Sequence, residues 1–182
     1  MEAPTARLIS KIYTLDNIAA KNLLMQYEWM IKWVQWALDE IGDDDFEESA
    51  YEGGNSAVWL LGHLIVSDDD FSLYMGTGDR LYPEYVSMFG TNTKPVPIDE
   101  YPSINELKVA WKKVCEKNME VYKSFTDEVL LEKHNRINEE GEDFIKTKGE
   151  VAGVWQLHQA YHAGQIGQIA SRLKKEKVKL TA

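Results

Sequence analysis

Apolar side chains recur every three or four residues along four long segments of the chain. The first segment runs from about Asp16 to Ile41. One stripe of apolar residues along it consists of Leu23, Tyr27, Met30, Val34, Leu38 and Ile41. This spacing places the side chains on one face of a helix. We therefore predict an amphipathic helix over this range, with its apolar face turned toward a core.

The other three segments begin with helix-start signals. The second is predicted to begin at Asn55 as its N-cap and to end near Met75, because Gly76 follows. Each of the last two begins with a capping box, in which a hydroxyl side chain and a Glu three residues later satisfy each other's free amide donors. These pairs are Ser103 with Glu106 and Thr147 with Glu150.

The connections between these segments differ in length. The segment from Gly76 to Tyr101 is long enough to cross a bundle, and loops of this size often cover functional sites. Thr126 can cap a short helix that ends near Lys133, and the stretch from His134 to Lys146 indicates a small β-hairpin. The pattern favours an all-α four-helix bundle with one long crossover, and residues 1–182 fit a single domain.

A second apolar stripe lies beside the first one on the first predicted helix. Trp29, Trp33 and Trp36 follow helical spacing and widen the apolar face beyond what one bundle core needs. Two explanations are open at this point. Either a loop of the same chain covers the tryptophans, or the helix contacts a second copy in a homodimer.

The net charge of the chain argues against two classes of binding partner. The chain has 182 residues with 20 Lys and Arg against 30 Asp and Glu, so its formal net charge is −10. Such a surface repels phosphate, which argues against nucleic acids and anionic membranes as partners. Eight acids fall between Asp39 and Glu52, where we expect a solvated loop, and five bases lie between Arg172 and Lys179, at a helix C-terminus.

Cysteine content and targeting signals point to the cytoplasm. The single cysteine, Cys115, excludes an intrachain disulfide and is expected to be a small buried residue, not a nucleophile. Met1 to Tyr13 contains no apolar core of a secretory signal, and the run from Val58 to Val66 is too short to span a bilayer. We predict a cytoplasmic protein.

Histidine supplies the candidate chemistry. His158 and His162 are four residues apart on a predicted helix, so both imidazoles leave one face about 6 Å apart at Cβ, a distance that suits two ligands of one ion. Alone, such a pair is more often a buried, hydrogen-bonded pair. His63 lies on the inward stripe of the second helix, and one divalent cation can accept a lone pair from each of the three.

Other metal motifs are excluded by inspection. Gln159 follows His158, so the helix lacks the H-E-x-x-H pattern of a metalloprotease. A di-iron bundle needs Glu-x-x-His, but Trp155 and Gln159 precede the two histidines by three. The pattern therefore predicts one mononuclear site, with His134 interpreted as a surface or hairpin residue.

Four short motifs resemble the DinB superfamily, also called YfiT-like. In chain order they are N-x-x-x-W-x-x-G-H-L from Asn55, Phe89-Gly90, Tyr-Pro-Ser from Tyr101, and H-x-x-x-H-x-x-Q-I from His158. The resemblance implies an up-up-down-down four-helix bundle, frequent homodimers, and a site for Ni, Zn or another divalent ion. The ligands that it implies are His63, His158 and His162.

The resemblance also implies candidate activities. Members of the superfamily include transferases and isomerases that use low-molecular-weight thiols such as bacillithiol or mycothiol. We hypothesise that a bound ion lowers the pKa of a water or of a thiol cosubstrate, so that the protein acts on a small molecule as an S-transferase or hydrolase. The alternatives are a metal-binding dimer without turnover, serving as an interaction or stress-response module, and purely structural histidines.

Several further residues are candidates for the surroundings of the ion. Asp70, two turns after His63, could accept a hydrogen bond from a ligand or carry a proton, unless the run Asp68-Asp69-Asp70 is simply solvated. Five aromatic residues could wall a pocket, although aromatics at helical spacing are more often core. They are Trp59, Tyr74, Tyr85, Phe89 and Trp155.

Overall fold

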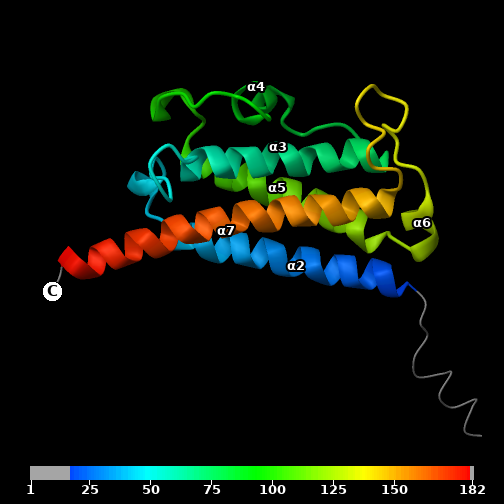
Figure 1. The fold of residues 1–182 in the computed structure, drawn as a ribbon, viewed down its shortest axis with the longest axis horizontal. Helices are drawn as coiled ribbons and strands as arrows, with labels where there is room; N and C mark the ends of the chain where they lie inside the picture. The colour runs from blue at the N-terminus through cyan, green and yellow to red at the C-terminus, as the bar shows by residue number, and fades with distance from the viewer. Residues whose placement is uncertain (1–16, 181–182) are drawn as a thin grey trace, which may run out of the picture.

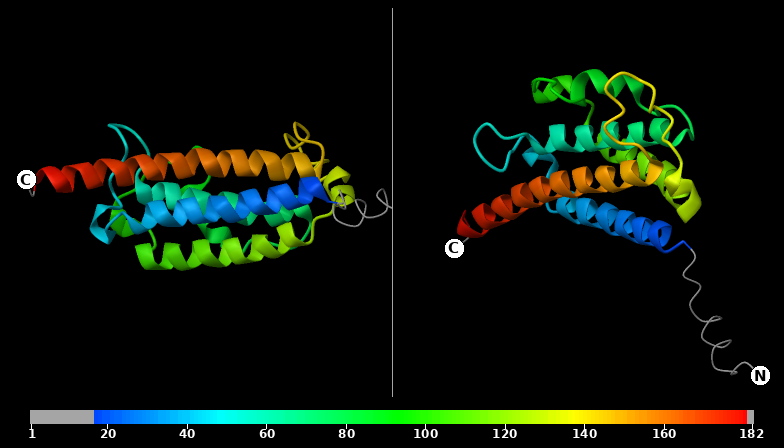
Figure 2. Two further views of the ribbon diagram at one scale, coloured as in Figure 1. Left: turned by 90° about the horizontal axis from the view of Figure 1, so that it is seen from below. Right: turned by 45° about the vertical axis from the view of Figure 1, so that its right-hand side comes forward.

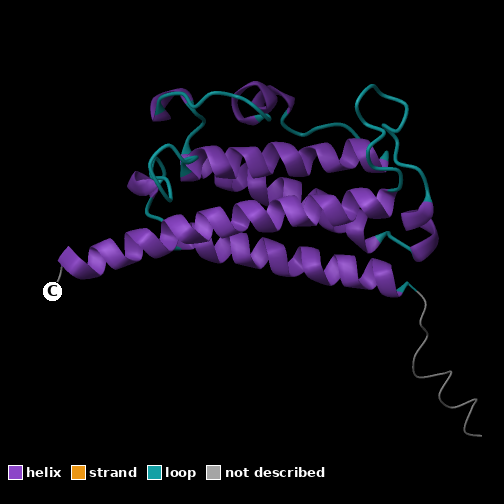
Figure 3. Cartoon of the chain, in the orientation of Figure 1, coloured by secondary structure: helices purple, strands orange, loops and turns teal. Residues whose placement is uncertain are grey.

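Four long helices dominate the structure, a computed structural model that describes residues 17–180 (Figure 1). Shorter helical turns lie in the connections, and no β-strand occurs within the described range (Figure 3). The all-α prediction is therefore confirmed, while Asp16, where the first helix was expected to begin, lies outside the described residues. The long helices are α2 Ile18–Asp39, α3 Ala57–Met75, α5 Ile104–Lys123 and α7 Lys148–Leu180; the short ones are η1 Asp43–Asp45, η2 Pro83–Tyr85, α4 Val86–Phe89, η3 Ile98–Glu100 and α6 Asp127–Leu131.

The long helices share one core, in which α2 and α3 each pack against both α5 and α7. Within 17–180 no helix is both long and apolar enough to cross a membrane. Helix α7 runs beside α2 and extends past the other helices at its C-terminal end (Figure 2).

The direction of the helices differs from the up-up-down-down order that the resemblance implied. Lys174 near the end of α7 pairs with Glu40 at the end of α2, so these two helices are parallel. Asn118 in α5 donates to the Asp68 carbonyl in α3, each in the second half of its helix, so these two are also parallel. Lys108 near the start of α5 pairs with Asp43 just after α2. The helices α3 and α5 therefore run antiparallel to α2 and α7. The order is up-down-down-up: the α3–α5 connection returns the chain along the bundle, whereas the other two connections join antiparallel helices.

The helix-start signals are largely confirmed. Ser103 and Glu106 form the predicted capping box of α5, and the Thr147 hydroxyl accepts from the Glu150 amide at the start of α7. At α3, however, the N-cap is Ser56, whose hydroxyl accepts from the Trp59 amide, and not the neighbouring Asn55. Local cap chemistry locates these helix starts to within one residue.

Helix α3 is buried around almost its whole circumference. Helices α5 and α7 cover its inner side, and the crossover between α3 and α5 lies along its outer side (Figure 1). The Phe89 ring of this crossover packs directly on Gly62, where a Cβ would come within 2.2 Å of the ring. The absence of a side chain at Gly62 thus lets the crossover approach α3 closely.

The predicted hairpin from His134 to Lys146 is wrong. The segment forms successive turns closed by one isolated bridge between Lys133 and Thr147. His134, expected to be a surface or hairpin residue, is buried inside this segment. Its Nε2 donates to the Ile145 carbonyl, and its Nδ1 accepts from the Arg136 amide. A side chain that bonds to both arms of the loop replaces the ladder that a hairpin would have made.

The acidic run after α2 is not a simple solvated loop. Glu40, Glu48 and Asp45 form ion pairs with Lys174, Arg172 and Lys177 in the last turns of α7. The two charge clusters that were interpreted separately therefore compensate each other. This pairing anchors the extended end of α7 to the α2–α3 connection.

The run Asp68-Asp69-Asp70 is also not solvated, since Asp68 and Asp69 are fully buried. Asp69 pairs with Lys117 at 2.7 Å and accepts from the Tyr82 amide, which ties the crossover to α5. Asp68 accepts from the Tyr27 hydroxyl at 3.0 Å. Burial raises the pKa of Asp68 to about 7, so its neutral form is favoured in the folded core.

Asp68→Asn is expected to flatten the pH dependence of stability. The unfolded carboxyl ionises near pH 4 and the folded one near pH 7, so the wild type loses stability as pH rises between these values. From pH 5 to pH 8 this loss amounts to roughly 2–3 kcal/mol, and the amide, which does not titrate, removes it. Urea unfolding of both proteins at the two pH values measures the difference, and equal pH dependence in both would contradict a raised pKa at Asp68.

Candidate metal centre

Three histidines from two helices meet at one place between α3 and α7. His63 lies in α3, and His158 and His162 lie one turn apart in α7, which runs antiparallel to α3. The Nε2 atom of His158 lies 3.1 Å from Nε2 of His63 and 3.0 Å from Nε2 of His162. An ion that binds imidazoles at about 2.0–2.1 Å with tetrahedral angles separates their nitrogens by about 3.3–3.4 Å, which is close to these spacings.

Two of the imidazoles are oriented by a hydrogen bond at the opposite ring nitrogen. His63 Nδ1 lies 2.7 Å from the Phe89 carbonyl oxygen in the crossover. His162 Nδ1 lies 2.7 Å from Oε1 of Gln165, one turn further along α7. Both partners are acceptors, so both Nδ1 atoms carry the proton and both Nε2 atoms present a lone pair. Such outer partners set the tautomer and the direction of metal-binding histidines.

The three Nε2 atoms have too few protons to satisfy one another by hydrogen bonds, and a bound cation resolves this. His158 Nε2 can donate one proton at most, so it can satisfy either His63 or His162 but not both. At least one pair of nitrogen lone pairs therefore faces each other at about 3 Å, which is unfavourable in a buried place. A divalent ion accepts all three lone pairs at once, and the residues present fit such a group.

The protonation states are also those that a metal requires. Burial lowers the pKa of His63 and of His162. Burial and the two neighbouring imidazoles lower the pKa of His158 to about 4. All three side chains are thus neutral near pH 7, with their lone pairs available.

The five predicted pocket aromatics fall into two groups. Trp59 stacks on His63 with ring centroids 4.7 Å apart, and its Nε1 donates to Thr93 of the crossover. Phe89 and Tyr85 contact each other edge to face on the same side of α3. Tyr74 and Trp155 contact each other at 4.6 Å, and Trp155 donates to the Ser67 carbonyl, one turn beyond His63. The structure therefore places the Trp59 ring and the Phe89 carbonyl directly at His63, with Tyr85 against Phe89, whereas Tyr74 and Trp155 form a separate group further along α3.

Asp70 and Cys115 have other surroundings. The Asp70 carboxylate forms an ion pair with Arg80 of the crossover, and the acceptors for the two histidines are the Phe89 carbonyl and Gln165 instead. Cys115 is buried, as predicted, and burial raises the pKa of its thiol. A buried neutral thiol is a poor nucleophile.

The sequence pattern did not assign a role to either acceptor of the histidines, the Phe89 carbonyl or the Gln165 side chain. Gln165 had a readable signal, because a residue three positions after His162 shares its helix face. The acceptor of Phe89 is a backbone carbonyl, which every residue has, so no side-chain pattern could have indicated it. Its position depends on the contact between the Phe89 ring and Gly62.

The fold and the site together define a class: an all-α protein in which long helices hold three neutral histidines around a site suited to one divalent metal ion. Comparison with protein families agrees with this class, since the model of the DinB superfamily matches residues 26–166. The chain belongs to the DinB superfamily. A search of curated proteins found no match.

Proposed function

We propose that this protein is a divalent-metal-dependent enzyme that acts on a small molecule, as a thiol-dependent S-transferase or as a hydrolase. His63, His158 and His162 would hold the ion, and Zn and Ni, the metals we propose, are among those that suit imidazole ligands. The convergence of three neutral Nε2 atoms carries the proposal. Three protein ligands are the number that catalytic zinc sites use when one position is left for a reactant.

The chain's own residues prepare this site in two ways. The Phe89 carbonyl and Gln165 hold two imidazoles with their Nε2 lone pairs directed inward. The Trp59 ring stacks on His63 and shields one face of that ligand from water. A bound divalent ion supplies Lewis acidity, which lowers the pKa of a coordinated water or thiol.

The charge of the ligand set supports an anionic reactant such as a thiolate. Each described hydrogen bond of the three imidazoles involves a neutral group, either a carbonyl, an amide side chain or another imidazole. The ligands therefore leave the charge of a divalent ion uncompensated. An anionic sulfur is electrostatically favoured at such a centre.

A thiol-transfer assay tests the proposal. Protein purified without a His tag and loaded with Zn or Ni is expected to transfer bacillithiol, glutathione or coenzyme A to an electrophile faster than the uncatalysed reaction. His162→Ala should fall to the background rate because it removes one ligand, while Leu131→Ser, an exposed position on α6, should keep full activity. A parallel ester-hydrolysis screen covers the hydrolase alternative.

Equal background rates in wild type and His162→Ala in both assays would favour the second candidate, a metal-binding interaction module without turnover. The observation that favours this candidate is the large exposed apolar surface on α2 and α7. Metal bound by the wild type but absent from His162→Ala would then identify a binding protein.

A further inference from the structure

One short turn of the crossover contacts two successive turns of α3 beside the metal centre. The Phe89 carbonyl accepts from His63 Nδ1 at 2.7 Å, and the Thr93 hydroxyl accepts from Trp59 Nε1 at 3.1 Å. Trp59 and His63 are four residues apart in α3, so their side chains are neighbours on one helix face. We call residues 89–93 the clamp turn, because it binds both of these side chains.

The Thr93 hydroxyl makes two hydrogen bonds whose directions are fixed by its partners. Its single proton goes to the Gly90 carbonyl at 2.9 Å, because a carbonyl can only accept. A lone pair of the hydroxyl oxygen accepts from Trp59 Nε1, because an indole N–H can only donate. Both capacities of the hydroxyl are therefore used, and the second of them holds the indole ring in place.

The Trp59 indole in turn restricts the His63 imidazole. The two rings stack with centroids 4.7 Å apart and planes 11° apart, and both side chains are buried. Rotation of the imidazole about its Cβ–Cγ bond would tilt its edge into the indole and break the hydrogen bond to Phe89. The clamp turn thus acts on His63 twice, once directly and once through Trp59, and both contacts direct Nε2 toward His158.

The backbone of the clamp turn is closed by its own contacts. The Thr93 amide donates to the Gly90 carbonyl at 3.2 Å, and the Gly90 amide donates to the Val86 carbonyl at 3.0 Å. A Cβ at Gly90 would lie 2.6 Å from that Val86 oxygen, so a larger residue would displace the backbone. Asn92 has a left-handed φ of 66°, which asparagine tolerates better than most residues. The turn therefore fixes the Thr93 hydroxyl relative to the Phe89 carbonyl.

We propose that Thr93 is a positioning residue of the metal centre, which acts through the Trp59 indole on the orientation of His63. Such a role rests on the proposed function, in which His63 is a ligand of the ion. An imidazole that is already held in its binding orientation loses less rotational freedom when it binds, so the affinity for the ion is higher. The hydroxyl of Thr93 thereby connects the crossover to metal binding without touching the ion.

Thr93→Val tests the role, because valine has nearly the same shape and lacks the hydroxyl. The affinity for Co²⁺, a probe of zinc-type sites, should fall roughly 3- to 10-fold, the effect of losing one neutral hydrogen bond. The visible absorption bands of bound Co²⁺, which depend on ligand geometry, should shift as well. Thr93→Ser keeps the hydroxyl and should behave like the wild type. Thr91→Val, the same substitution at an exposed position of the clamp turn, is the matched control.

A double-substitution cycle identifies the route of the effect. Trp59→Phe keeps a ring beside His63 but has no N–H for Thr93 to accept. Adding Thr93→Val to Trp59→Phe should therefore change the Co²⁺ affinity by less than about twofold. Full additivity of the two effects would overturn the proposal. A Thr93→Val protein with lower thermal stability but wild-type affinity and absorption would also overturn it, because a purely structural hydroxyl gives that result.

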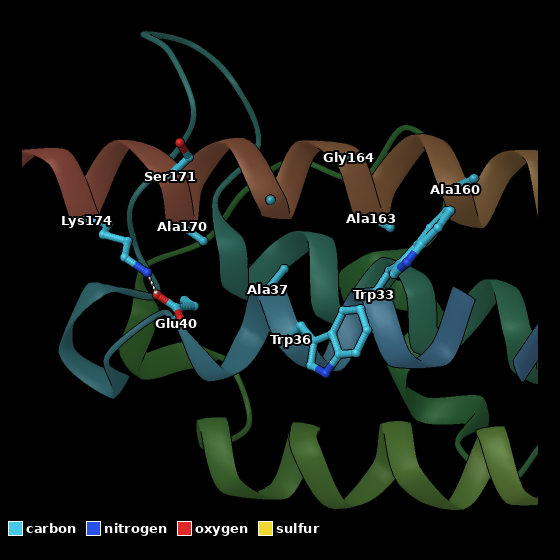
Figure 4. A pocket seen from close by; sticks show the side chains of 11 residues that line it. Trp33, Trp36, Ala37, Glu40, Ala160, Ala163, Gly164, Ala170, Ser171 and Lys174 are labelled. Atoms are coloured by element: carbon cyan, nitrogen blue, oxygen red, sulfur yellow. Dashed lines mark hydrogen bonds and ion pairs between the residues drawn. The ribbon is translucent and has the colours of Figure 1, made fainter. Parts of the chain in front are cut away.

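A measurement on the metal-free protein separates this role from the proposed function. Thr93→Val should shift the ¹⁵N NMR signals of the His63 ring, whereas Thr91→Val should leave them unchanged. Tryptophan emission is less suitable, because Trp33 and Trp36 also emit from exposed positions beside an open cavity between α2 and α7 (Figure 4). A wild type that binds no Co²⁺ would refute the metal centre, and unchanged His63 signals in Thr93→Val would refute the role of Thr93.

Discussion

Replacing His158 with alanine is expected to abolish stoichiometric binding of Zn or Ni near pH 7. His158 Nε2 is the central nitrogen of the three, about 3 Å from each neighbour. Its loss removes one ligand and leaves only the two imidazoles of His63 and His162 to bind the ion. The affinity should fall by more than the roughly 10- to 100-fold that is typical when only an outer-shell partner is removed. Elemental analysis and competition with a chromophoric chelator measure the bound metal and its affinity.

His134→Gln is the matched control, since it also removes a buried histidine. His134 uses one ring nitrogen as a donor to Ile145 and the other as an acceptor from Arg136, so neither is free to bind a metal. This variant should retain the metal while losing roughly 1–3 kcal/mol of stability from its broken hydrogen bonds. A His158→Ala protein that still holds one equivalent of metal would refute the three-histidine site, and so would a wild type that takes up far less than one.

Gly62→Ala is expected to destabilise the protein and weaken metal binding together, although alanine is the better helix former. A methyl group at this position would lie 2.2 Å from the Phe89 ring, well inside contact distance. Such overpacking costs roughly 3 kcal/mol and outweighs the gain of about 1 kcal/mol in helix propensity. Moving Phe89 also moves the carbonyl that orients His63, so metal affinity should fall as well. Thermal unfolding of the apo protein and metal titration give the two effects separately.

Two comparisons identify the cause of this effect. Gly153→Ala, in α7, adds a methyl group that meets nothing within 4 Å, and it should leave stability unchanged or raise it slightly. Adding Phe89→Leu to Gly62→Ala reduces the clash and should restore part of the lost stability through a favourable coupling between the two sites. If Gly62→Ala behaved like Gly153→Ala, the close contact between the crossover and α3 would not exist in solution.

The predictions that held depend on local chemistry. A helix repeats every 3.6 residues, so the apolar spacing along α2, α3, α5 and α7 indicated the long helices directly. Cap hydrogen bonds join residues only three positions apart, which is why the box at Ser103 and Glu106 was readable. The same regularity made His158 and His162 a pair on one face, and the inward stripe around His63 added the third member.

The predictions that failed depended on contacts between distant segments. The polar sequence around His134 is compatible with a surface hairpin, and only its packing against Tyr74 of α3 shows it to be buried. The three aspartates from Asp68 look solvated by composition, yet α2 and α5 supply Tyr27 and Lys117 as their partners. Burial of a polar group is decided by the neighbours that other elements bring to it.

By itself the sequence therefore determined the long helices, the starts of α3, α5 and α7 to within one residue, and the three histidines, because each depends on residues a few positions apart. The tertiary structure decided the up-down-down-up order, which depends on which connection spans the bundle. It also assigned the Phe89 carbonyl and Gln165 to the histidines. Within residues 17–180 it left Trp29, Trp33 and Trp36 exposed. A backbone acceptor and an uncovered surface have no residue pattern of their own, and they exist only once distant segments lie side by side.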